Sequence, residues 1–149
     1  MSDATLLTVS PSPHVHTGLT TPQIMRGVII ALLPAVILSV IVFGLPALVT
    51  LTTTVVSCVF FESLIARYLL KQEAAIGDGS AVITGLLLAF NVPAGPPWYV
   101  ILIGSAVAVG IGKMTFGGLG NNPFNPALVG RVFLVVSFPV QMTTWPTVD

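Results

Sequence analysis

The chain has 149 residues, of which 54% are hydrophobic and only 7% are charged, and its formal net charge is zero. A typical soluble domain is about 25% charged, so this composition leaves too few polar residues to cover a water-facing surface. It also excludes a disordered chain, which combines low hydrophobicity with high charge, and a basic nucleic-acid binder. The composition therefore predicts a membrane protein that has the lipid bilayer, and no nucleic acid, as a partner.

The apolar segments, taken in chain order, predict an all-α polytopic membrane bundle. A membrane-spanning helix needs roughly 20 apolar residues, and the uncharged run from Gly27 to Phe61 is long enough for two. A turn signal at Phe43-Gly44-Leu45-Pro46 divides this run. We expect an N-terminal tail over residues 1–23 and a transmembrane domain over 24–149. The expected elements are spans at 24–43, 47–70 and 98–112, a half-helix at 81–90 and a broken helix at 127–138.

The segment 81–90 is too short to cross a bilayer as a helix. At the helical rise per residue it covers about 15 Å, half of the hydrocarbon core, and the proline-rich stretch after it cannot continue a helix. Extended backbone at this depth is expected only where it lines a cavity in the protein. One interpretation is a half-helix aimed at a buried site lined by Thr84, Gly85 and Asn91. The alternative is an ordinary connector in which Asp78 or Ser80 caps the helix.

The few cationic residues predict the orientation in the membrane. Arg26, Lys71 and Lys113 lie at edges of predicted spans, and Arg67 lies near them. The loop between the first two spans has no Lys or Arg, so the positive-inside rule places the N-terminus in the cytoplasm.

Three charged residues lie in or beside apolar segments and are candidates for function. Glu62 and Arg67 lie close together near the end of the second span. They are either a pair that reaches the membrane interface or residues of an ion path or partner contact. Arg131 lies inside the last apolar element, which makes it a candidate for facing a cofactor, an ion path or a buried partner.

The stretch from Phe116 to Arg131 is the most informative part of the chain. Glycines there allow positive φ angles and close approach to a ligand, and they are Gly117, Gly118 and Gly120. Asn122 and Asn125 offer carboxamides that both donate and accept hydrogen bonds, which suits the edge of a uracil-like or isoalloxazine ring. The alternative is a capped connector, with Asn125 as N-cap and Pro126 at the first helical position.

Other chemistry finds little support. His14 and His16 are too few for a metal site, and Cys58, the single cysteine, is interpreted as a small buried side chain. The sequence contains no catalytic triad, paired catalytic carboxylates or HExxH motif. We therefore expect no catalytic residue and no metal site.

Several motifs in one order resemble a known family. They are Gly77-Asp78-Gly79-Ser80-Ala81, the whole stretch from Phe116 to Arg131, and Ser137-Phe138-Pro139-Val140-Gln141-Met142-Thr143. They resemble the NqrB/RnfD family of ion-pumping membrane redox complexes, and the Asn-Pro-Phe-Asn-Pro-Ala form fits its Rnf branch better than its quinone-reductase branch.

The resemblance implies a helical membrane protein of two inverted halves, each with a broken helix. It further implies a place in a complex of the bacterial or archaeal cytoplasmic membrane, with flavin and iron–sulfur subunits as partners. Such a complex passes electrons between ferredoxin and NAD, or a related pair, and moves sodium ions or protons. The family carries FMN attached through its phosphate to a threonine, and the quinone-reductase relatives associate the matching loop asparagines with riboflavin. Carried over, these asparagines are Asn122 and Asn125, with Gly117, Gly118, Gly120, Arg131 and Thr84 as further cofactor-binding candidates.

The chain departs from the family in length and in one motif. It ends at Asp149, at about half the expected length, and the Ser/Thr-Gly-Ala-Thr-like attachment motif is missing from it. We expect it to be the N-terminal portion of a larger protein, with a split subunit as the alternative, and to have enzyme activity only within a complex. Two other hypotheses remain open: a solute channel or transporter without a redox role, and a purely structural membrane subunit.

Overall fold

The computed structural model describes residues 18–69, 71 and 76–147, and within these ranges every regular element is helical. Three helical stretches are long and apolar enough to cross a membrane: Thr21–Phe43, Leu45–Leu69 and Trp98–Phe116. The predicted all-helical membrane bundle is thus confirmed. His14 and His16 lie outside the described residues, as does most of the N-terminal tail.

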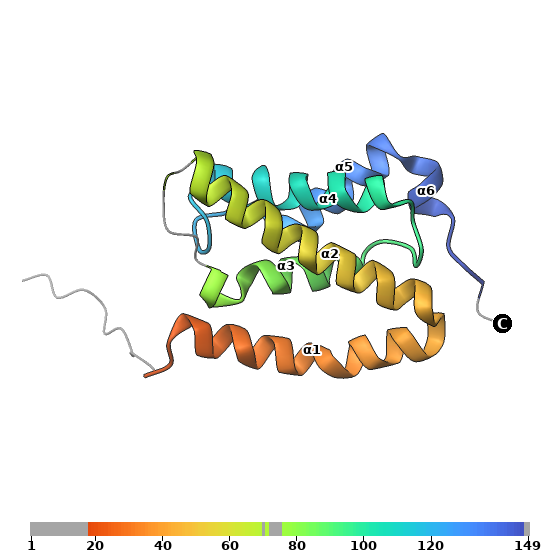
Figure 1. The fold of residues 1–149 in the computed structure, drawn as a ribbon, viewed down its shortest axis with the longest axis horizontal. Helices are drawn as coiled ribbons and strands as arrows, with labels where there is room; N and C mark the ends of the chain where they lie inside the picture. Colours follow the sequence, from red (N-terminus) through yellow and green to blue (C-terminus); the bar gives the residue numbers. More distant parts are fainter. Residues whose placement is uncertain (1–17, 70, 72–75, 148–149) are drawn as a thin grey trace, which may run out of the picture.

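Helix α1, Thr21–Phe43, forms one edge of the bundle (Figure 1). Its first turn is closed by a bond in which the Thr20 backbone N–H donates to Gln23 Oε1 at 2.8 Å, a capping arrangement that satisfies an unpaired helix-end donor. None of the α1 residues is buried within the described part of the chain. Its apolar surface is therefore available to lipid or to further protein.

Helix α2, Leu45–Leu64, is the central element and follows α1 after the single residue Gly44. Gly44 has a φ of 68°, a left-handed value that glycine adopts without steric cost. A π-helical turn, η1, continues the helix over Ile65–Leu69. Small and polar side chains dominate the buried side of α2, and they are Ala47, Thr50, Leu51, Thr54, Ser57, Cys58 and Glu62.

Helix α3, Ser80–Ala89, has only 10 residues and lies where the sequence predicted a half-helix at 81–90. It follows a 3-10 turn, η2, over Ile76–Asp78. Most of its residues are buried, and it lies so close to α2 that a Cβ added at Gly85 would stand 2.6 Å from the Val55 Cα. The connecting segment 90–97, which has no helical structure, then leads to α4, Trp98–Gly110.

The last elements pack against α4. After the 3-10 turn η3, Met114–Phe116, a loop leads to α5, Pro126–Ser137, and then to the short α6, Pro139–Thr143. Figure 1 shows that the ends of α2 and α4 and the starts of α3 and α5 gather at one end of the bundle. The Gly44 turn, the chain between α3 and α4, and α6 lie at the other end.

Candidate functional site

A buried ion pair lies where α2, α3 and α4 meet. Lys113 Nζ is 2.6 Å from Glu62 Oε2, and the two residues are 2% and 3% exposed. Removing both charges from water costs several kcal/mol per ion, and this cost is offset only by close pairing and further hydrogen bonds. An ionisable pair kept at such a cost in a membrane segment is a candidate for function.

The interpretation of Glu62 and Arg67 as an interfacial pair is wrong. Glu62 is buried and pairs with Lys113, whereas Arg67 is exposed. Lys113 follows the end of α4, where the sequence placed the end of a span, but its side chain is buried among protein atoms. The short distance along the sequence between Glu62 and Arg67 was misleading. The partner of Glu62 lies after the end of α4, 51 positions further along the chain.

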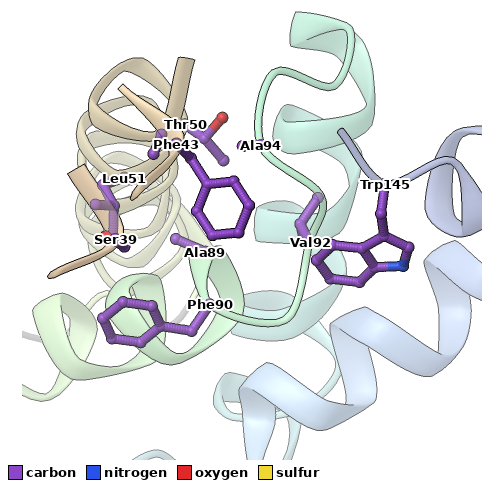
Figure 2. A pocket seen from close by; sticks show the side chains of 10 residues that line it. Ser39, Phe43, Thr50, Leu51, Ala89, Phe90, Val92, Ala94 and Trp145 are labelled. Atoms are coloured by element: carbon purple, nitrogen blue, oxygen red, sulfur yellow. The ribbon is translucent and has the colours of Figure 1, made fainter. Parts of the chain in front are cut away.

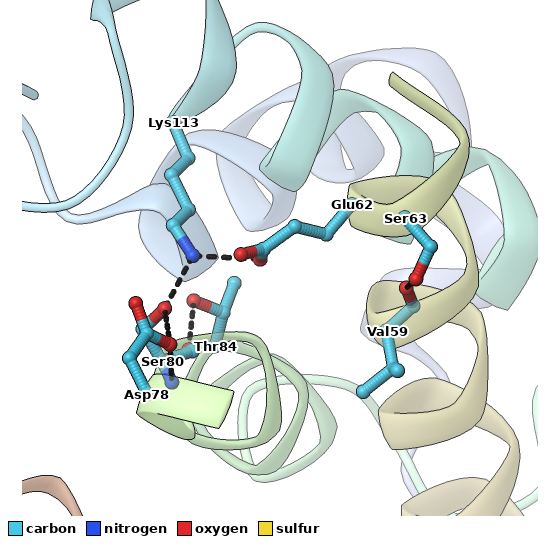
Figure 3. A network of polar contacts seen from close by, with 7 residues as sticks. All are labelled: Val59, Glu62, Ser63, Asp78, Ser80, Thr84 and Lys113. Carbon is cyan, nitrogen blue, oxygen red and sulfur yellow. Dashed lines mark hydrogen bonds and ion pairs between the residues drawn. The ribbon is translucent and has the colours of Figure 1, made fainter. Parts of the chain in front are cut away.

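The ion pair continues into a hydrogen-bonded network at the start of α3 (Figure 3). Lys113 Nζ also donates to Ser80 Oγ. The Ser80 hydroxyl in turn donates to Asp78 Oδ1 at 2.6 Å, and the Ser80 backbone N–H donates to the same oxygen at 2.8 Å. Asp78 therefore caps α3, as one of the two interpretations of this segment expected. One chain of polar contacts thus joins Glu62, Lys113, Ser80 and Asp78.

Glu62 also lies in the last turn of α2, close to an irregular turn. The regular part of α2 ends at Leu64, and the π-helical turn Ile65–Leu69 follows. Such turns are rare and are found frequently at functional sites. The π-helical turn thus makes this end of α2 a candidate for function independently of the charge on Glu62.

Beside this network lies a cleft of about 290 Å³. Helix α1, helix α3 and the loop before α5 supply its walls, with Lys113 joining from the end of α4. Its polar lining consists of Ser80, Thr84, Lys113, Asn122 and Asn125, and its apolar lining of Met25, Ile83, Leu87, Leu119 and Pro126. Three of the residues predicted from sequence, Thr84, Asn122 and Asn125, thus meet around one space.

The two asparagines are partly engaged with their own loop. Asn125 Oδ1 accepts a hydrogen bond from the Ala127 backbone N–H at 3.0 Å, which is the N-cap of α5. Asn122 Nδ2 donates to the Phe124 carbonyl oxygen at 2.7 Å. Among the residues that the structure describes, no partner is recorded for the Asn125 amide nitrogen or the Asn122 amide oxygen, so both could bind a ligand. Capping and ligand binding are therefore compatible, and the two interpretations of this loop do not exclude each other.

The remaining predicted residues lie outside the cleft lining. Gly117, Gly118 and Gly120 have φ angles of 96°, 91° and 90°, so they shape the loop that carries the asparagines. Arg131 is exposed, and its Nη1 donates to Asn91 Oδ1 at 2.8 Å in the chain that follows α3. It thereby connects α5 to the end of the half-helix. Direct cofactor contact by these four residues stays a prediction.

Sequence reasoning missed the part that Lys113 plays in the site. The segment after α4 reads as an ordinary membrane edge, and the spacing between residues 62, 80 and 113 follows no motif. The available signal was indirect: Glu62 is an acidic residue next to a long uncharged run, and it needs a cationic partner if it is buried.

The family described as NQR2, RnfD, RnfE matches residues 8–149. Over 138 residues the chain is 49% identical to a subunit of the Na(+)-translocating ferredoxin:NAD(+) oxidoreductase complex of Acetobacterium woodii, covering 93% of this chain and 43% of that protein. It is 46% identical to the corresponding subunit of the ion-translocating oxidoreductase complex of Mannheimia succiniciproducens, and 42% identical to that of Cronobacter sakazakii, covering in each case 92% of this chain and 39% of the relative. The chain thus spans about two fifths of the length of these relatives. On these matches, the chain belongs to the NQR2, RnfD, RnfE family.

Proposed function

We propose that the chain forms part of a membrane subunit of an ion-translocating oxidoreductase complex and acts only within that complex. The family match and the names of its relatives support this proposal. By analogy with the relative from Acetobacterium woodii, the electrons would pass between ferredoxin and NAD, or a related pair, and drive sodium ions or protons. Flavin and iron–sulfur subunits would be the partners, in the cytoplasmic membrane of a bacterium or archaeon.

We propose that the N-terminus of this subunit faces the cytoplasm. Arg26 lies near the start of α1 and Arg67 near the end of α2. These helix ends lie at the same end of the bundle (Figure 1). Cationic residues concentrated on one side favour the cytoplasmic side.

Within this subunit, we propose that the cleft holds the ring system of a non-covalently bound flavin. One observation carries the proposal: Thr84, Asn122 and Asn125 come from two separate segments and line the same space. The asparagine amides suit a ring edge that alternates hydrogen-bond donors and acceptors, whereas the Thr84 hydroxyl, which donates to the Ser80 carbonyl oxygen, can only accept. Ile83, Leu87 and Leu119 supply apolar contact for the ring faces.

The size of the cleft fits a ring system better than a complete nucleotide. Ligand sites measure roughly 300–1,000 Å³, and this cleft of about 290 Å³ stands at the lower limit. The residues present therefore fit riboflavin or the ring end of FMN. The threonine that would carry covalently bound FMN is not among these 149 residues.

A bound flavin would supply electron transfer, while this chain binds and orients it. The Asn125 amide nitrogen would donate to an acceptor on the ring edge, and the Asn122 amide oxygen would accept from a ring N–H. The apolar side chains would exclude water from the ring faces. No group of the cleft needs to transfer a proton for this task.

The test is the flavin content of the complete complex carrying changes in the full-length protein. Asn125→Asp keeps the oxygen that caps α5 but removes the amide donor, and Asn122→Leu removes the amide of Asn122. Both variants are expected to lose most of the flavin that denaturation without proteolysis extracts. Asn121→Leu is the matched control, because Asn121 lies in the same loop but outside the cleft lining.

Equal flavin content in all three variants would contradict the flavin site. A colourless full-length protein of unmodified mass that conducts a solute without redox partners would favour a channel or transporter, to which a half-helix at membrane depth is equally suited. A visible flavin spectrum that Asn125→Asp removes and Asn121→Leu retains is the result expected here.

A further inference from the structure

We propose that Lys113 is the cation that contacts the flavin in the cleft and stabilises the negative charge that reduction adds to it. Glu62 and Ser80 hold the Lys113 ammonium in place for this task. The inference rests on the proposed flavin site and assigns to it a residue that the loop motif does not contain.

The first argument is geometric. Lys113 lines the cleft together with Asn122 and Asn125, although its side chain is almost completely buried. A lysine ammonium has three N–H donors. Glu62 Oε2 accepts one of them and Ser80 Oγ accepts a second. Within the described residues no acceptor is recorded for the third N–H, and we assign it to an acceptor in the cleft, such as a ring carbonyl or a ring nitrogen.

The second argument is electrostatic. Glu62 and Asp78 do not line the cleft, whereas Lys113 does. The residue that carries the positive charge therefore borders the cleft, whereas the Glu62 carboxylate reaches it through Lys113 and the Asp78 carboxylate through the Ser80 hydroxyl. The Lys113 side chain is almost completely buried, and a charge in such surroundings interacts more strongly than it does in solution. A ring that gains negative charge is therefore stabilised more than the uncharged ring.

A purely structural role for the ion pair makes a different prediction. If Lys113 only connects α4 to α2 and α3, replacing both charges with neutral amides should leave the ligand unaffected, provided the fold is intact. If Lys113 contacts the ligand, the same double change should alter the relative affinity for the reduced and oxidised flavin. The double variant Glu62→Gln/Lys113→Gln leaves no unpaired buried charge and is therefore the safer variant for folding.

The experiment is a redox titration of the assembled complex that contains the full-length protein. The transition that disappears in Asn125→Asp identifies the cleft flavin among the other redox groups. In Glu62→Gln/Lys113→Gln we expect about a tenfold loss of preference for the reduced flavin, which lowers a two-electron midpoint potential by about 30 mV. Glu62→Gln alone should shift the midpoint in the opposite direction, because it leaves the cation without its counter-charge. Lys113→Arg, which keeps the charge, should stay near the wild-type potential.

An unchanged midpoint potential in the double variant, with flavin retained, would overturn the role of Lys113 and leave the flavin site standing. Loss of flavin from an assembled double variant but not from Glu62→Gln supports direct contact. Loss from both would show that the network only maintains the shape of the cleft, which would also overturn the inference. If Asn125→Asp removes no transition, the proposed flavin site itself has failed.

Discussion

At one end of the bundle, the start of α3 adjoins a cleft of about 290 Å³ that Lys113 and four uncharged polar residues line. At the other end, residues at and just after the end of α3 line a pocket of about 80 Å³ in which Phe43, Phe90 and Trp145 predominate (Figure 2). The short helix α3 thus extends from a charged environment to an apolar one. The charged end has space for a ring-sized ligand, and the apolar end has space only for a much smaller group.

The two ends also differ in how the backbone polar groups are satisfied. At the charged end, the Asp78 carboxylate accepts from the first N–H group of α3. At the apolar end, the Gly95 backbone N–H donates to Thr50 Oγ1 at 3.0 Å, and the Thr50 hydroxyl donates to the Pro46 carbonyl oxygen at 2.9 Å. The Arg131 guanidinium also donates to Asn91 Oδ1 at this end, but Arg131 is exposed. The difference between the two ends is therefore burial of charge: Glu62 and Lys113 are buried, and their cost calls for a functional explanation.

The largest expected effect comes from breaking the ion pair at the charged end. Lys113→Met leaves Glu62 buried without a partner and should lower the free energy of unfolding by about 3–5 kcal/mol. Glu62→Leu/Lys113→Met should recover most of this loss, because it removes both desolvated charges. Chemical unfolding of the full-length protein in detergent measures both values. If Lys113→Met were as stable as the wild type, the charged end would have to be accessible to water.

An intermediate effect is expected midway between the two ends, where α3 lies against α2. Gly85→Ala would place a Cβ 2.6 Å from the Val55 Cα, so the two backbones must separate, at a cost of about 1–3 kcal/mol. Gly110→Ala is the matched control, because the atom that its Cβ would meet, the end of the Ile65 side chain, lies at an ordinary contact distance of 3.4 Å. Thermal unfolding should rank Gly85→Ala as the more destabilised variant. The reverse order would contradict the close α2–α3 contact.

The smallest effect is expected at the apolar end. Thr50→Val removes the hydroxyl that accepts from Gly95 and should cost about 1 kcal/mol, the net value of one neutral hydrogen bond. Thr50→Ser keeps the hydroxyl and should retain most of the stability. Flavin content, measured together with unfolding, should be unchanged in both variants. Loss of flavin from Thr50→Val would show that the two ends are coupled through α3.

Much of the site could be predicted from local chemistry. Asn125 followed by Pro126 is a helix-start pattern that depends on two adjacent residues, and the structure confirms that Asn125 caps α5. Asp78 at the start of α3 is a local feature of the same kind. The cleft could not be predicted in this way, since Thr84 and Asn122 come from segments whose distance depends on how α3 and α4 pack.

The sequence by itself determined the class of the protein, because composition and apolar run length decide whether a chain can stay in water and how many times it can cross a bilayer. It also supplied the local signals at which α3 and α5 begin, since capping residues and prolines act on their immediate neighbours. Only the tertiary structure decided that Glu62 pairs with Lys113 and that this pair adjoins the asparagine loop. A buried charge takes whichever partner the packing of distant helices brings within reach, and no spacing along the chain specifies that distance.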